Sequence, residues 1–486
     1  MPDTVPTVGR TGATAWTTET MNDAASASSP AALPPSSRGS PILSSPPLRT
    51  MARLVPPSVA STLVQSMILL VEAYWLGDLG TNALASVALV FPAYMLANML
   101  ASGAIGGAVS GTLARALGAG RPDRAQEVVN AAWMIAFVVG GAFGAAMLVG
   151  GEPLFRLLGG RDEILAGALE YSRIMFGGIV VLWLFNLLGA CLRGAGEMRA
   201  QLSAMIVVTA THFVLASLLV PGRGYVPPLG LAGAAIAILL AYACGLAWLL
   251  LVVARRAHPP RLEAWRMPSA FVLRPVARLG SLASSQSIMT IAYSMIATGL
   301  IARLGTDWLA GYGVGLRLEL LMIPVIFGMG GTLIAICGAF VGAGERERAV
   351  RIAWGGAFAT AAFVGAIGLV LAWQPQLWHG LFTEDPEVAR ACAAYLRIVG
   401  PCYAFFGLGL CLYFASQGVD SLAVPVAGTL LRVAIMAIGA AVVGAAAEPS
   451  PRAAFGVMAF AMVAYGVTIS GGLALGPWRS RRSGSG

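Results

Sequence analysis

Few ionisable side chains lie inside the long apolar stretches of this 486-residue sequence, and Glu72 is the first of them. Gln65 precedes it by seven residues, which is two turns of an α-helix and therefore the same helix face. Because desolvation penalises the charged form of a carboxyl, such a group can hold a proton at neutral pH and release it when a cation arrives. Glu72 and Gln65 are therefore predicted to form a site for a coupling ion. The alternative is a carboxylate that reaches water or a neighbouring arginine.

Histidine, arginine and a second glutamate interrupt further apolar stretches. His212 is a candidate partner of Glu72 because a free imidazole titrates near neutral pH, although a lone histidine is more often only hydrogen-bonded. Arg317 and Glu319 lie two residues apart, so their side chains diverge on a regular helix and a structural role is the alternative. Arg432 lies where an apolar stretch begins, where it can extend to the membrane surface. The candidates for a substrate path are Arg317, Glu319, Gln286, Thr290, Gln417 and Arg432.

The sequence lacks the residue patterns that common enzyme classes need. All 31 basic residues are arginines, so no lysine is available for a phosphate-binding loop or a Schiff base. Six cysteines lie at apolar positions without CxxC spacing, and the three histidines form no HExxH motif. No catalytic residue, metal site or cofactor is expected, and transport by this chain would not use an ATPase site of its own.

The composition indicates a membrane protein with helical spans. Hydrophobic residues make up 57% of the chain, charged residues 11%, and the mean hydropathy is +0.78. A transmembrane helix needs about 20 predominantly apolar residues. Twelve such windows can be drawn, near 57–76, 86–113, 131–150, 174–192, 202–221, 229–253, 281–302, 309–341, 352–373, 397–415, 422–446 and 453–475.

The net charge of +9 orients the protein and does not indicate a nucleic-acid partner. Arginines cluster in alternate connections, at 115–124, 193–199, 255–278 and 346–351, whereas the connection at 384–387 is acidic. Cytoplasmic loops of membrane proteins carry an excess of basic residues. We therefore expect a multi-pass protein of the cell membrane with both chain ends in the cytoplasm.

The apolar part of the sequence contains an internal repeat, with its two copies about 225 residues apart. The stretch Leu79-Gly-Thr-Asn-Ala-Leu-Ala85 recurs as Leu304-Gly-Thr-Asp-Trp-Leu-Ala310, and Tyr171-Ser-Arg-Ile174 recurs as Tyr395-Leu-Arg-Ile398. Internal repeats of helical membrane units are typical of secondary transporters, with the substrate path between the repeats. Each copy holds an even number of spans, so both copies enter the membrane from the same side.

The chain accordingly divides into five predicted segments. Residues 1–50 are rich in proline, serine, alanine and threonine and are expected to form a disordered tail. A six-helix lobe is placed at 52–253, a cytoplasmic linker at 254–278, a second six-helix lobe at 279–476 and a basic tail at 477–486. We expect the chain to act as a monomer in the lipid bilayer.

Several stretches resemble the multidrug and toxic compound extrusion (MATE) family of multiple-drug antiporters, over about residues 52 to 475. The most specific lie at 71–80, 84–120, 313–344, 416–418 and 430–432. The resemblance implies an all-α membrane protein with twelve transmembrane helices in two pseudo-symmetric lobes that form a V. It also implies export of amphipathic organic cations or drugs in exchange for Na⁺ or H⁺.

Departures from the family pattern favour H⁺ over Na⁺ as the coupling ion. The family's first-helix acid is usually Asp and is Glu72 here, which keeps the carboxyl. Its fifth helix usually carries Asn-x-x-Leu-Asp, which aligns with His212-Phe-Val-Leu-Ala216, and the seventh-helix acid of some members falls near Thr290. Na⁺ needs several oxygen ligands, whereas an imidazole suits a proton.

Three other functions are less consistent with the sequence than a drug antiporter. A flippase for a lipid-linked precursor, from the same broad superfamily, should line its cavity with several basic residues, and arginines inside the spans are few. An ion channel would not require the two-lobe duplication. An intramembrane enzyme would need a nucleophile or a metal constellation. The expected partners are therefore small molecules and the lipid bilayer, and the identity of the substrate stays open.

Overall fold

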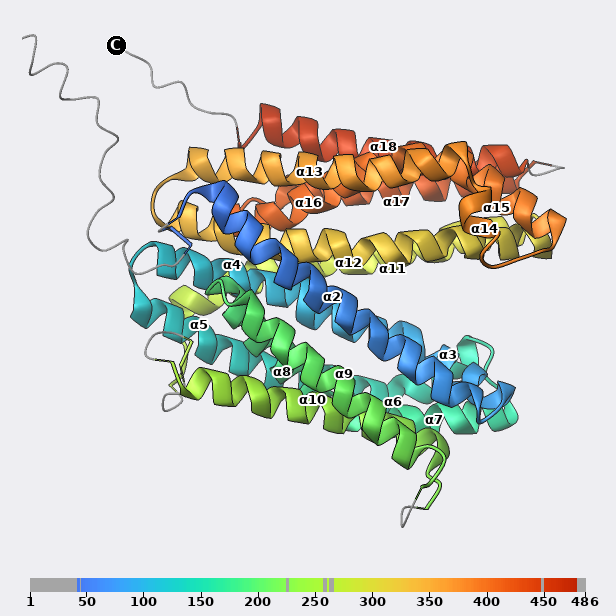
Figure 1. Cartoon of the computed structure of the whole chain (residues 1–486), viewed down its shortest axis with the longest axis horizontal. Coiled ribbons are helices and arrows are strands. Elements are labelled where there is room, and N and C mark those ends of the chain that lie inside the picture. Colours follow the sequence, from blue (N-terminus) through green and yellow to red (C-terminus); the bar gives the residue numbers. More distant parts are fainter. Residues whose placement is uncertain are drawn as a thin grey trace, which may run out of the picture.

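The computed structural model describes residues 42–43, 45–223, 227–256, 260–261, 266–446 and 450–478. Within these ranges the chain is helical and contains no β-strand, which confirms the predicted all-α membrane fold. Figure 1 shows two groups of helices, α2 to α10 and α11 to α18, which correspond to the two halves of the sequence. We call them the N-lobe and the C-lobe.

The N-lobe contains five straight or gently interrupted spans and one bent span. The bent span joins α7 to α8 at an angle of 48°. The elements are α2 (Pro47–Gly77), α3 (Thr81–Asn98), the π-helical turn η2 (Met99–Ala104), α4 (Ile105–Gly118), α5 (Pro122–Ile135), the π-helical turn η3 (Ala136–Gly140), α6 (Gly141–Leu157), α7 (Asp162–Gly177), α8 (Ile179–Gly194), α9 (Met198–Leu219) and α10 (Gly230–Ala254).

The C-lobe repeats this order without a π-helical turn in its described residues. Across both lobes, eleven helices are long and apolar enough to cross a membrane, and the bent pair supplies the twelfth predicted span. The elements are α11 (Ala270–Ala302), α12 (Thr306–Gly342), α13 (Arg346–Trp373), α14 (Gln376–His379), α15 (Pro386–Val399), the 3₁₀ turn η4 (Gly400–Cys402), α16 (Tyr403–Val419), α17 (Ala423–Gly444) and α18 (Pro451–Leu475).

The duplication extends to the backbone. Gly80 and Gly305 precede the second helix of their lobes with φ angles of 98° and 110°, a region that strongly favours glycine. Each glycine therefore turns the chain sharply from the first helix of its lobe into the second. The Leu-Gly-Thr repeat seen in the sequence is this turn.

The two lobes touch closely where α4 and α12 end. A Cβ atom on Gly118 would lie 2.1 Å from the carbonyl oxygen of Ala339, and one on Gly342 would lie 2.1 Å from the carbonyl oxygen of Arg115. No side chain fits at these distances, so glycine is what allows the two backbones to meet. Small residues play the same part wherever helices pack closely in lipid.

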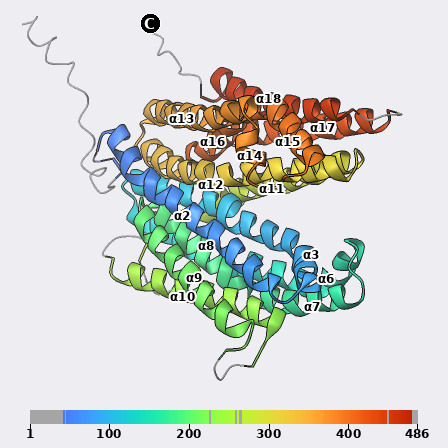
Figure 2. The same ribbon diagram turned by 45° about the vertical axis from the view of Figure 1, so that its right-hand side comes forward.

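The lobes diverge from this contact toward the turns at Gly80 and Gly305 (Figures 1 and 2). The closed end is followed by Arg121 in the connection after α4 and by Arg346 and Arg348 in the first turn of α13. The lobes therefore form a V whose closed end lies on the arginine-rich side of the molecule.

Two predicted segment boundaries differ from the structure. The 1–50 tail lies mostly outside the described residues, but α2 already begins at Pro47, and Ile42 and Leu43 are buried. The 254–278 linker is shorter than expected, because α11 begins at Ala270 and the second lobe therefore starts before 279. Hydropathy windows miss both helix starts because arginines lie near them, at Arg49 and Arg53 in α2 and at Arg274 and Arg278 in α11. Of the 477–486 tail, only 477 and 478 are described.

Candidate functional site

Glu72 lies on α2 and points into the N-lobe. Its side chain is 7% exposed, and its Oε1 atom accepts a hydrogen bond from the hydroxyl of Tyr171 on α7. A phenol hydroxyl that donates to a carboxylate stabilises the charged form of that group. The structure thus gives the predicted acid a specific partner, which is a tyrosine from the fourth span.

A second tyrosine lies near both Gln65 and Glu72. Tyr242 on α10 lies close to the side chains of Gln65 and of Tyr94 on α3. Both Tyr94 and Tyr242 are close enough to Glu72 to be influenced by its charge. We call Glu72, Tyr171, Tyr94, Tyr242 and Gln65 the N-lobe carboxyl site. It groups one acid, three phenols and one amide from four helices.

His212 lies apart from this site. It is fully buried on α9 and faces the backbone of Ala237 on α10. Neither ring nitrogen has a side-chain partner within the described residues. The structure therefore does not bring His212 into hydrogen-bond contact with Glu72, the arrangement that the sequence suggested.

The C-lobe contains a second carboxyl group bound to tyrosine. Glu319 on α12 accepts a hydrogen bond from the hydroxyl of Tyr395 on α15, which in turn accepts one of 3.2 Å from Tyr403. Arg317 points elsewhere, with its guanidinium 5.0 Å from the ring centre of Phe382. The two side chains diverge, as their spacing predicts.

Arg432 does not extend to the membrane surface. It is 5% exposed, and its guanidinium lies 3.9 Å from the ring centre of Tyr293, 5.0 Å from that of Phe406 and 5.5 Å from that of Tyr465. A guanidinium can be held in apolar surroundings by the faces of aromatic rings. Arg432 also lies near enough to Glu319 to attract its charge.

The remaining candidates from the sequence, Gln286, Thr290 and Gln417, take part in hydrogen bonds to the backbone. Thr290 donates a 2.9 Å hydrogen bond to the carbonyl of Gln286 within α11. Gln417 on α16 is fully buried, and its Nε2 atom donates to the carbonyl of Gly103 at 3.5 Å. Arg115 of the N-lobe donates to the carbonyls of Gln417 and Gly418 at 2.8 and 2.9 Å. Gln417 therefore joins the two lobes at their closed end.

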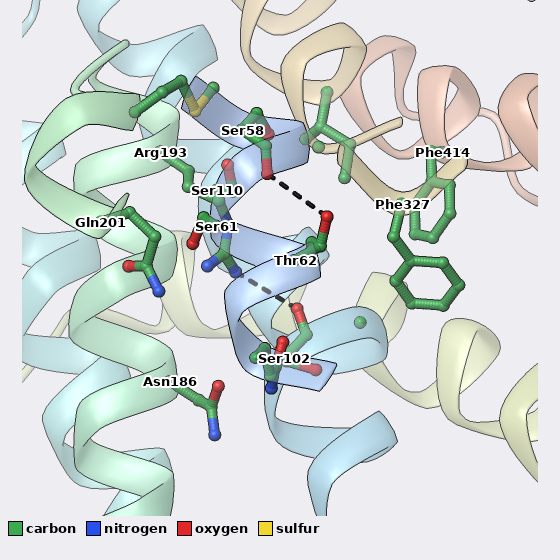
Figure 3. Close-up of a pocket in the computed structure, with 16 residues that line it drawn as sticks. Ser58, Ser61, Thr62, Ser102, Ser110, Asn186, Arg193, Gln201, Phe327 and Phe414 are labelled. Atoms are coloured by element: carbon green, nitrogen blue, oxygen red, sulfur yellow. Dashed lines mark hydrogen bonds between the residues drawn. The ribbon is translucent and has the colours of Figure 1, made fainter. Parts of the chain in front are cut away.

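A pocket lies between the lobes, next to this contact (Figure 3). Its volume is about 60 Å³, room for roughly four or five water molecules. Drug-sized ligands need pockets of about 300 Å³ or more, so the lobes must separate further to admit one. The lining residues are Ser58, Ser61, Thr62, Gln65, Ser102, Gly103, Gly107, Ser110, Asn186, Arg193, Met198, Gln201, Phe327, Gly331, Ile334 and Phe414.

Arg193 in this pocket was missed by the sequence reasoning, which placed it in a cytoplasmic connection. It belongs to the last turn of α8, and its Nη2 atom donates a 3.3 Å hydrogen bond to the carbonyl of Ser102 in η2. The charge count near span ends does not distinguish an arginine just inside a helix from one just outside. The polar residues Ser102, Ser110 and Asn186, each within a predicted span, were the available signal.

Helix α2 connects the N-lobe carboxyl site with the lobe interface. Ser58 donates to the carbonyl of Gly328 at 2.8 Å, and Thr62 donates to the carbonyl of Pro324 at 2.6 Å, both on α12. Glu72 lies further along the same helix, and Gln65 contributes to both the carboxyl site and the pocket. A shift of α2 would therefore change the contact with α12, the N-lobe carboxyl site and the pocket together.

Known proteins are similar to this chain in sequence and in architecture. The chain is 25% identical to the FAD transporter of Shewanella oneidensis over 77% of this chain and 82% of that protein. It is 22% identical to the probable multidrug resistance protein NorM of Thermotoga maritima over 79% of this chain and 83% of that protein. Among solved structures, an outward-facing multidrug resistance MATE family transporter superposes with a TM-score of 0.79 at 23% identity, over 90% of this chain and 97% of the other.

One family model matches each half of the chain separately. The model named MatE matches residues 57–218 and again residues 283–443, one match in each lobe. The two matches together cover more than half of the chain and coincide with the duplication seen in the sequence. The chain belongs to the MatE family of membrane transporters.

Proposed function

We propose that this chain is a secondary active antiporter that exports small organic molecules in exchange for H⁺, with Glu72 as the residue that carries the proton. The observation that carries the proposal is the position of Glu72, which is buried against Tyr171 on the same helix that contacts the C-lobe. One helix therefore holds the proton-binding group and part of the surface that must move.

The exchange follows from the hydrogen bonds of the two protonation states. A deprotonated Glu72 accepts from the Tyr171 hydroxyl, whereas a protonated Glu72 has a proton of its own to donate and needs an acceptor. The change of partner moves α2 relative to α7. Because Ser58 and Thr62 attach α2 to α12, that movement reaches the contact between the lobes.

The neighbours of Glu72 support H⁺ over Na⁺. They are phenol hydroxyls, and no cluster of three or more Asp, Glu, His or Cys residues occurs in the described part of the chain. Na⁺ is a hard cation and favours several carboxylate or carbonyl oxygens. A single carboxyl with a phenol partner is sufficient for a proton.

The side of the membrane is also part of the proposal. The arginine-rich connections beside the closed end of the V would face the cytoplasm of a cell membrane by the positive-inside rule. Both chain ends would then be cytoplasmic, and the described conformation would open to the outside. A monomer is sufficient for this cycle, since both lobes belong to one chain.

Two substrate classes have support. The family resemblance and the multidrug resistance relatives support amphipathic cations or drugs, whereas the FAD transporter relative supports an anionic molecule. The alternative of a flippase for a lipid-linked precursor is less well supported, because several basic residues would be needed and the pocket lining contains one, Arg193.

Transport by the purified protein in liposomes would test the coupling. A panel of fluorescent substrates should accumulate when a pH gradient is imposed at constant Na⁺, and a Na⁺ gradient at constant pH should have little effect. Strict dependence on Na⁺ would contradict the proposal. Efflux without either gradient would indicate a passive carrier.

A further inference from the structure

We infer that the pocket between the lobes is a subsite for the anionic group, a carboxylate or a phosphate, of an aromatic organic ligand, with Arg193 as its charged residue. The inference rests on the proposed function only in that the ligand is a transported molecule. It concerns the charge of the ligand and makes no assumption about the coupling ion.

The charge of the pocket carries the inference. Of its lining side chains, eight are neutral hydroxyls or amides and one, Arg193, is charged; no carboxylate lines it. Glu72, the acid of the N-lobe, does not reach the lining. A ligand in this pocket therefore meets a net positive charge, which attracts an anion and repels an organic cation.

Most of the hydrogen-bond donors of Arg193 are unused within the described residues. A guanidinium carries five N–H donors, and within the described residues it uses one, toward the carbonyl of Ser102 at 3.3 Å. No carboxylate of the described chain lies within 4 Å of it to form an ion pair. Arg193 is only partly exposed, and a poorly neutralised guanidinium favours a carboxylate or phosphate, which it can bind with two parallel hydrogen bonds.

Neutral donors surround the guanidinium. The hydroxyl of Ser110 is buried and has no hydrogen-bond partner within the described residues. The amides of Asn186 and Gln201 line the same side of the pocket (Figure 3). Hydroxyl and amide groups can all donate to the oxygens that Arg193 leaves free.

The opposite wall is aromatic. Phe327 on α12 and Phe414 on α16 meet edge to face with their ring centres 4.8 Å apart, and Figure 3 shows them across the pocket from Arg193. An anionic group would thus be held by the N-lobe while an aromatic body contacts the C-lobe. A ligand with both parts fits this division.

Both lobes would contact such a ligand. A methyl group on Gly331 of α12 would lie 3.9 Å from Cδ of Arg193 and 3.8 Å from Oγ of Ser58. The stem of Arg193 therefore already reaches the C-lobe. The coupling proposed above acts through a movement of α2, so the ligand and the proton need not compete for the same charged group. An anionic substrate is therefore compatible with that coupling.

Binding of two dyes that share one ring system would test the inference. Fluorescein is anionic and rhodamine 123 is cationic, and both are planar xanthenes whose fluorescence polarisation reports binding to the full-length protein in nanodiscs. Fluorescein should bind more tightly than rhodamine 123, and inorganic phosphate should displace fluorescein. Tighter binding of rhodamine 123, or no effect of phosphate, would overturn the inference.

Substitution of the arginine separates a binding role from a structural one. Arg193→Gln should weaken fluorescein binding by about ten- to a hundredfold and leave rhodamine 123 binding unchanged or improved. Arg193→Lys should restore part of the preference. The matched control is Arg199→Gln, an exposed arginine six residues further along the chain, which should change neither affinity. Equal weakening of both dyes by Arg193→Gln would mean that Arg193 only supports the fold, and would overturn the inference.

Two further measurements distinguish loss of the anion subsite from misfolding and from loss of proton coupling. If Arg193→Gln does not fold, the two dyes and phosphate competition on the unaltered protein still decide the question. Glu72→Gln should keep the preference for fluorescein even where it abolishes H⁺-driven transport. A failure of the proposed coupling is therefore distinguishable from a failure of the anion subsite.

Discussion

Tyr171 and Tyr395 lie 224 positions apart in the duplicated sequence, and each donates a hydrogen bond to a glutamate of its own lobe. The glutamates are not repeats of each other. Glu72 comes from the first helix of the N-lobe, whereas Glu319 comes from the second helix of the C-lobe. The duplication thus kept the phenol and changed the helix that supplies the acid.

The counterparts of the two acids confirm this difference. With the 225-residue offset between Leu79 and Leu304, Glu319 corresponds to Tyr94 and Glu72 corresponds to Ala297. The N-lobe acid lies among phenols and an amide, while the C-lobe acid has Arg432 nearby. A nearby guanidinium favours the charged carboxylate, so the two sites are not interchangeable.

Replacing Glu72 tests the proton-carrying group directly. Glu72→Gln keeps the size of the side chain but cannot release a proton, so the substrate gradient of about tenfold that one pH unit supports at one-to-one exchange should be lost. Glu72→Asp should retain activity because the carboxyl survives. The measurement is dye export from proteoliposomes under an imposed pH gradient. Full export by Glu72→Gln would place the coupling elsewhere, with Glu319 as the next candidate.

The Tyr171 hydroxyl should set the pH at which the proton is released. Its hydrogen bond stabilises the deprotonated Glu72, so Tyr171→Phe makes release harder and should move the pH profile of export upward by about one unit. Tyr395→Phe, the equivalent change in the C-lobe, is the matched control and should leave the profile in place. An unshifted Tyr171→Phe profile, or equal shifts in both variants, would remove Tyr171 from the mechanism.

His212 should matter for stability and not for coupling. The ring is buried on α9 without a hydrogen bond to Glu72, so His212→Ala should lower the free energy of unfolding by about 1–3 kcal/mol and leave the pH profile of export unchanged. Thermal unfolding in detergent and the export assay measure the two effects. A displaced pH profile would return His212 to the coupling role that the sequence suggested.

The glycine contact at the closed end should control the population of conformations. In Gly118→Ala the new methyl group would meet the carbonyl of Ala339, and overpacking of this kind costs about 1–3 kcal/mol. The lobes should therefore spend more time apart at this end. Spin labels at Ala119 and Ala343 would report a longer distance in the variant. Gly355→Ala, whose methyl group would meet no atom within 4 Å, is the control, and a longer distance there too would count against a specific effect.

The sequence was sufficient for the helices because each span needs a long apolar run, and such runs are visible without a structure. It also pointed to Glu72, since a carboxyl in an apolar helix is conspicuous. The partner Tyr171 was not predictable, because a tyrosine is unremarkable in a span and its contact with Glu72 depends on how α7 packs against the lobe. Arg193 was misplaced for a similar reason, as one helical turn decides between a loop and the pocket.

The central helices are longer than the membrane is thick. α12 has 37 residues, which makes it about 55 Å long, whereas the hydrocarbon core of a bilayer measures about 30 Å. Such a helix must tilt or extend into the lipid headgroups, and α2, with 31 residues, runs obliquely to it (Figure 1). Opening and closing the V changes these tilts and with them the hydrophobic thickness that the protein presents. The acyl chain length of the surrounding lipid therefore contributes to the free-energy difference between the two conformations, and the bilayer itself takes part in setting the rate of the cycle.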